Sequence, residues 1–139
     1  MAMTLRAYRE GDELGMTLTP ESEAAYNDDI KDSLDRLRYD ETYTCLDKNN
    51  KVCGIGSLQW QGDKTYCVWA LFDKDRGYKA LRDFKRIVDF YVERGNILYT
   101  ISSESEMQTR MHKFIGFNEQ ELMGDKRVWV KSLKRYLSQ

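Results

Sequence analysis

Apolar residues are spaced three and four positions apart in three segments of the chain, which is the pattern of an amphipathic helix. The first segment, 19–38, opens with a threonine, a proline and a glutamate, a sequence typical of a helix start. The second covers 79–94 and the third runs from Ser103 to Ile115, and a glycine that suits a helix end follows each. Ser103 and Glu106 have the spacing of a capping box, so we expect them to close the start of the third helix.

Shorter runs rich in β-branched and aromatic residues alternate with polar turns, as strands do. These runs cover 4–9, 42–46, 52–60, 65–72, 96–102, 117–123 and 127–133. The run 65–72 is apolar almost throughout, which favours a central strand buried on both faces. The order β-α-β-β-β-α-β-α-β-β predicts a mixed α/β (α+β) fold, in which helices flank a largely antiparallel sheet in a single domain over 1–139.

Composition narrows the classes of function that fit the chain. A length of 139 residues with 41% apolar and 32% charged residues predicts one folded domain with a polar surface. The net charge of −1 argues against a protein whose main role is to bind nucleic acid. No apolar run approaches membrane-spanning length, and residues 1–18 lack the core of a signal peptide, so we expect no membrane contact and a cytoplasmic location.

The cysteines and the histidine limit the chemistry. Cys45, Cys53 and Cys67 form no Cys-x-x-Cys pair, and an odd number of cysteines on predicted strands favours reduced, buried thiols over a disulfide framework. His112 is the single histidine, which excludes a multi-histidine metal site. We therefore expect no metal dependence.

A basic glycine turn joins the strand at 65–72 to the second helix. It reads Phe-Asp-Lys-Asp-Arg-Gly-Tyr-Lys over 72–79, and the first half of the helix carries Lys79, Arg82, Lys85 and Arg86. Cations at a helix start oppose the helix dipole, so they are best explained by an external anion such as a phosphate that meets the free backbone N–H groups. Two alternatives stay open: a solvated helix face balanced by nearby aspartates, and a contact with nucleic acid that the net charge disfavours.

This turn and the order of elements resemble the GNAT superfamily of N-acetyltransferases over nearly the whole chain. The resemblance implies that backbone groups of one strand bind the pantetheine of acetyl-CoA, that the turn and helix start hold its pyrophosphate, and that the next strand splays away. The cofactor-binding residues it implies are Ala70, Leu71, Phe72, Arg76, Gly77, Tyr78, Lys79, Ala80 and Arg82. The family turn reads Arg-Gly-x-Gly-x-Gly or Ala, whereas this chain has Lys79 and Leu81 in place of the later glycines.

A second family motif, Asn-x-x-Ala-x-x-x-Tyr-x-x-x-Gly-Phe, ends at Gly116-Phe117. Its tyrosine, which protonates the departing thiolate, falls on His112, and its asparagine falls on Ser105. An imidazolium could supply that proton near neutral pH; the alternative is that His112 is an ordinary residue of a short helix whose neighbours face the core. No glutamate lies in 65–72, where many relatives place a general base, so the base would be water or Glu104.

The resemblance implies an acetyl-CoA-dependent N-acetyltransferase that acts on an amine of a small molecule or protein. The alternative is a GNAT-fold binding protein that has lost catalysis, which the replaced glycines and tyrosine favour. The acidic first third, the basic segment 79–87 and the Met-x-x-Phe-Ile-Gly end of the short helix also resemble a GNAT-like group of short-tailed phages with a virion-associated member. In that case the location would be a host cytoplasm or a virion. The C-terminal hairpin would permit a homodimer.

Overall fold

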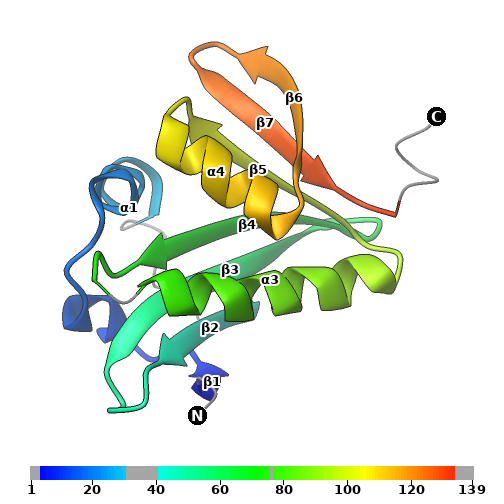
Figure 1. Ribbon diagram of the computed structural model, residues 1–139. Helices are drawn as coiled ribbons and strands as arrows, with labels where there is room; N and C mark the ends of the chain where they lie inside the picture. The colour runs from blue at the N-terminus through cyan, green and yellow to red at the C-terminus, as the bar shows by residue number, and fades with distance from the viewer. Residues whose placement is uncertain (1–3, 31–40, 76, 134–139) are drawn as a thin grey trace. The chain divides into compact units, whose positions relative to one another are not determined.

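The computed structural model describes residues 4–30, 41–75 and 77–133 (Figure 1). Its elements are β1(Thr4–Ala7), η1(Asp12–Gly15), α1(Pro20–Ala25), η2(Tyr26–Ile30), β2(Glu41–Leu46), β3(Val52–Gly62), β4(Thr65–Phe72), α3(Gly77–Glu93), β5(Ile97–Ser103), α4(Glu106–Ile115), β6(Asn118–Met123) and β7(Lys126–Lys131). The short element η1 is a 3-10 helix and η2 is a π-helix. This order confirms the predicted fold class.

The strands form one sheet in the order β1-β2-β3-β4-β5-β7-β6. The pairs β1–β2, β2–β3, β5–β7 and β6–β7 are antiparallel, and β4–β5 is parallel. The predicted mixed, largely antiparallel sheet is therefore confirmed. The prediction that β4 is buried on both faces was wrong for much of its length, because only Val68, Leu71 and Phe72 are buried and the other five side chains stay partly exposed.

The chain divides into two compact units. The first contains the residues up to Leu58 together with Trp69–Asp83, and the second contains Gln59–Val68 together with the residues from Phe84 onward.

In the first unit, α1 begins as its sequence predicts. The hydroxyl of Thr19 accepts a hydrogen bond from the backbone N–H of Ser22 at 3.1 Å, and Pro20 occupies the first helical position. The regular helix ends at Ala25 and continues as η2, and the rest of the predicted segment, 31–38, lies outside the described residues. The buried cluster around this helix contains Ile30 and Leu71, packed against Met16, Leu18, Ala25, Tyr26 and Trp69.

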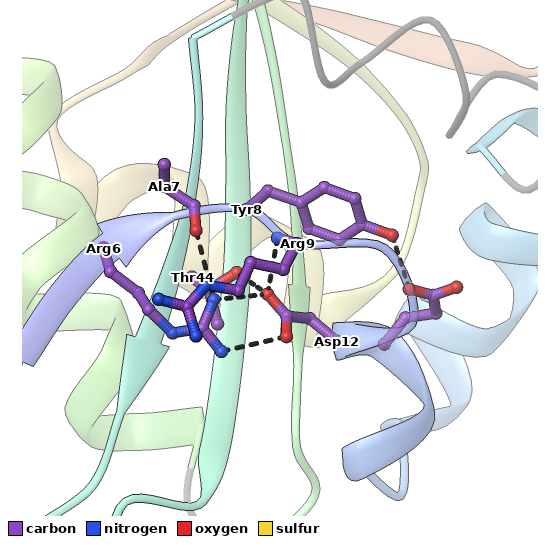
Figure 2. A network of polar contacts seen from close by, with 7 residues as sticks. Arg6, Ala7, Tyr8, Arg9, Asp12 and Thr44 are labelled. Atoms are coloured by element: carbon purple, nitrogen blue, oxygen red, sulfur yellow. Dashed lines mark hydrogen bonds and ion pairs between the residues drawn. The ribbon is translucent and has the colours of Figure 1, made fainter.

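A polar network fastens η1 to the strands of the first unit (Figure 2). The Asp12 carboxylate accepts two hydrogen bonds from the Arg6 guanidinium, at 2.8 and 2.9 Å, one from the Thr44 hydroxyl at 2.7 Å and one from the Arg9 backbone N–H at 2.9 Å. Burial alone would raise the pKa of Asp12, but these donors hold it below its ordinary value. Beside them the Tyr8 hydroxyl donates to Glu13. The network fixes the turn that leads from β1 towards α1.

In the second unit, α4 is capped at both ends by features that the sequence only partly predicts. The N-cap is Ser105, whose hydroxyl accepts from the backbone N–H of Gln108 at 3.1 Å, so the prediction of Ser103 was wrong: Ser103 is the last residue of β5. Gly116 ends the helix with a φ of 102°, as expected for a glycine cap. The Lys131 ammonium donates to the last helical carbonyl, that of Ile115, at 2.7 Å.

Candidate functional site

The connection between β4 and α3 is the candidate anion-binding site, and the start of α3 lies very close to the end of β4. A Cβ added at Gly77 would come within 2.6 Å of the Phe72 Cβ, so glycine is what permits this approach. In the same way, a Cβ at Gly54 of β3 would lie 2.6 Å from the Ala80 Cβ. The first turn of α3 is therefore packed directly onto the sheet of the first unit.

The segment 17–22, which we call the strap, runs along the end of β4. The backbone N–H of Thr19 donates to the Phe72 carbonyl at 3.2 Å, and the Phe72 N–H donates to the Ser22 hydroxyl at 3.0 Å. The Lys74 N–H donates to the Thr17 carbonyl at 2.7 Å. The strap thus satisfies both backbone groups of Phe72 from within the chain.

The predicted cofactor residues occupy different environments in the first unit. The side chains of Leu71, Phe72 and Ala80 are buried, that of Ala70 is partly exposed, and those of Lys79 and Arg82 are exposed. No described residue pairs with the Lys79 ammonium. Arg76 lies outside the described residues, as does the side chain of Tyr78. The structure brings together the end of β4 and the first turn of α3, whereas their role in cofactor binding stays a prediction.

The parallel ladder between β4 and β5 has three pairs in the second unit: Thr65 with Ile97, Tyr66 with Leu98 and Cys67 with Tyr99. In the last pair Cys67 and Tyr99 face each other across the ladder. Burial raises the pKa of the Cys67 thiol and of the Tyr99 hydroxyl, so both are protonated near neutral pH. Sequence reasoning missed this pair, because neither strand alone indicates which residue of the other it faces. The splay beyond this point stays a prediction.

Two of the three predicted catalytic residues have structural partners in the second unit. The Glu104 carboxylate accepts from the Arg127 guanidinium, with the Nε atom at 3.0 Å. Ser105 caps α4, as described above. A base role for Glu104 would compete with this exposed ion pair, and the role of either residue in catalysis stays a prediction.

His112, the third predicted catalytic residue, has the surroundings of a core side chain. It is 7% exposed, and its ring centroid lies 4.9 Å from that of Trp129 and 6.0 Å from that of Phe117. Its Nδ1 atom has no hydrogen-bond partner among the described residues. Burial lowers the pKa of His112 to about 4, so the ring is neutral near pH 7 and not the imidazolium that the sequence suggested. A proton would have to come from the neutral ring.

The remaining predictions concern thiols, metals and membranes. All three cysteines are free; Cys45 and Cys53 are buried as predicted, whereas the prediction was wrong for Cys67, which is partly exposed. In the described part of the chain, no three histidine, cysteine, aspartate or glutamate side chains gather as they would around a metal ion. None of the helices in the described ranges has the length and apolar character needed to cross a membrane.

Comparison with known proteins places the fold. No family profile matches the sequence, and no curated protein matches it. Among solved structures, a spermidine N-acetyltransferase chimera from Vibrio cholerae and hSSAT is 15% identical, with a TM-score of 0.69 and 100% of both chains covered. A GNAT superfamily phosphinothricin acetyltransferase from Sinorhizobium meliloti, in complex with AcCoA, is 16% identical, with a TM-score of 0.63, 94% of this chain and 88% of that chain covered. A GNAT family acetyltransferase from Staphylococcus aureus is 13% identical, with a TM-score of 0.66 and coverages of 96% and 100%. The chain therefore has the fold of the GNAT acetyltransferases.

Proposed function

We propose that the protein is an N-acetyltransferase that uses acetyl-CoA as the acyl donor and an amine as the acceptor. The observation that carries the proposal is the start of α3, packed against the end of β4 in a fold shared with acetyltransferases, one of them in complex with AcCoA. The first-turn N–H groups of an α-helix lack internal acceptors and favour an anion. The exposed Lys79 ammonium lies on that turn and adds a charge for a phosphate.

The first turn of α3 fits a diphosphate in part. The Gly77 N–H is already bonded to the Asp73 carbonyl at 2.8 Å, so this first donor of the helix is not available to a ligand. Leu81 stands where the family has a small residue, and its side chain is partly buried rather than fully turned to solvent. We therefore expect the diphosphate to be bound jointly by backbone N–H groups of this turn and by the Lys79 ammonium.

The reaction transfers the acetyl group directly from the thioester to the amine. The amine nitrogen forms a bond to the thioester carbon, the carbon–sulfur bond breaks, the amine loses a proton and the CoA thiolate gains one. Holding both reactants in place supplies much of the rate in such a reaction. The structural relatives act on spermidine or phosphinothricin by their names, so the acceptor classes to try first are a polyamine and an amino-acid-like amine. The solved structures compared above do not support the resemblance to the GNAT-like group of short-tailed phages.

Ligand-dependent stability tests the donor site. Acetyl-CoA at 100 times its dissociation constant should add about 2.7 kcal/mol to the free energy of unfolding, and no increase would contradict the proposal. Lys79→Glu should abolish this stabilisation, whereas Lys113→Glu, an equal charge change at an exposed position of α4, should leave it intact. Equal affinity of the Lys79 variant and the wild type would remove the phosphate assignment.

Turnover tests the enzyme itself. Release of the CoA thiol should depend on an amine from a panel of polyamines, amino-acid analogues and lysine peptides. Equal stabilisation by CoA and acetyl-CoA, with no thiol release on any amine, would instead indicate a cofactor-binding protein without catalysis.

A further inference from the structure

We propose that Asp73 is the positioning residue of the cofactor loop, the described residues 73–75 that follow β4. Its buried carboxylate holds the loop and the strap in the shape that the diphosphate of CoA needs. This inference rests on the proposed function and adds to it a residue that does not touch the ligand.

The Asp73 carboxylate is bound from two sides. The side chain is buried, with the residue 3% exposed. One oxygen, Oδ1, accepts from the Thr17 N–H of the strap at 2.9 Å, and Oδ2 accepts from the Asp75 N–H inside the loop at 3.0 Å. Hydrogen bonds to an ionised acceptor are stronger than neutral ones, and a buried carboxylate is tolerated only with such donors. The two bonds therefore fix the loop relative to the strap.

The backbone of Asp73 is engaged as well. Its N–H donates to the Cys53 carbonyl of β3 at 3.1 Å, and its carbonyl accepts from the Gly77 N–H at 2.8 Å. One residue thus connects β3, the strap, the loop and the first residue of α3. A change in its side chain will be transmitted to the N–H groups that follow Gly77.

The chain needs such a support because two glycines of the family turn are replaced. A glycine-rich turn lets the backbone adjust around a phosphate, whereas side chains at Lys79 and Leu81 restrict it. Donors that converge on an anion must then be aimed in advance. Asp73 supplies that order, because one of its oxygens accepts from the Asp75 N–H of the loop and the other accepts from the Thr17 N–H of the strap.

The test uses the variant Asp73→Asn, which keeps the shape of the side chain but can accept only one of the two backbone hydrogen bonds. Its activity is measured with two acyl donors, acetyl-CoA and S-acetylpantetheine. For acetyl-CoA we expect KM to rise about tenfold or more with kcat within about twofold, because fewer molecules have the binding-competent loop. For S-acetylpantetheine, which lacks the diphosphate, we expect kcat/KM to equal that of the wild type. Asp125→Asn, the same change at an exposed side chain of the turn between β6 and β7, should behave as the wild type with both donors.

The outcomes separate this inference from the proposed function. An unchanged KM for acetyl-CoA in Asp73→Asn would overturn the role of Asp73, and an equal loss with both donors would show a merely structural role. A wild-type protein that neither binds nor uses acetyl-CoA would overturn the proposed function and the inference with it. Should Asp73→Asn not fold, amide hydrogen exchange of the wild type decides: saturating CoA should slow exchange at Thr17 and Asp75, and unchanged rates would overturn the inference.

Discussion

Replacement of His112 by leucine should reduce the loss of stability between pH 7 and pH 5. The pKa of His112 falls from 6.5 to about 4 on folding because the side chain is buried among apolar groups. The folded protein therefore favours the neutral ring, and the unfolded chain binds the extra proton. Stability is complete above the unfolded pKa of 6.5 and is lost as the pH falls towards 4.

The size of the effect follows from the two pKa values of His112. At pH 5 the wild type should have lost about 2 kcal/mol of unfolding free energy through this group alone. Because Nδ1 has no partner in the described part of the chain, an apolar replacement leaves no orphaned donor, so His112→Leu should differ from the wild type by about 1.5 kcal/mol or less at pH 7.

Urea denaturation at pH 7 and pH 5, followed by tryptophan fluorescence, measures both quantities. The wild type should lose about 2 kcal/mol more than His112→Leu between the two pH values. Equal losses in the two proteins would refute the burial argument. If the proposed acetyltransferase activity is found, the same variant tests catalysis: a kcat equal to that of the wild type at pH 7 clears His112 of the acid role, and a reduced kcat with an unchanged fold supports it.

Other predictions concern packing and thiol reactivity. Lys131→Met should lower the free energy of unfolding by about 1–3 kcal/mol in urea titrations, because it removes the donor to the end of α4, whereas the exposed Lys113→Met should change little. Gly77→Ala should cost about 1–3 kcal/mol in the same assay, since the new methyl group meets Phe72, and an unchanged stability would contradict the close packing. With a thiol reagent, native protein should react first at Cys67, and the two buried cysteines should react only on unfolding; simultaneous labelling of all three would contradict their burial.

Periodic features of the sequence predicted the elements well. The strand at 65–72 has the predicted bounds. Helix α3 covers Gly77–Glu93, so it begins two residues earlier and ends one residue earlier than the predicted segment 79–94. These elements repeat one pattern over many residues, so a small error at one position matters little. The cap of α4 depended on a choice between Ser103 and Ser105 two positions apart, and only the end of β5 decides between them.

The candidate site was harder to predict because it depends on contacts between distant segments. Thr17 and Asp73 are 56 residues apart, and a backbone N–H that meets a distant carboxylate leaves no pattern in the sequence. The environment of His112 is set by Trp129 on a later strand. The match of His112 to the tyrosine of the family motif therefore could not reveal that its ring is buried. The basic turn, by contrast, is a local feature and was visible directly.

The Arg6–Asp12 pair has a consequence for how this protein can change over evolution. Each group is largely withdrawn from water and neutralised by the other, so loss of one alone would leave an uncompensated charge beside Thr44. Simultaneous replacement of both by neutral residues would avoid that penalty. Sequences that descend from a common ancestor with this chain should therefore exchange the two positions as a pair, and lineages that carry only one of them should be rare.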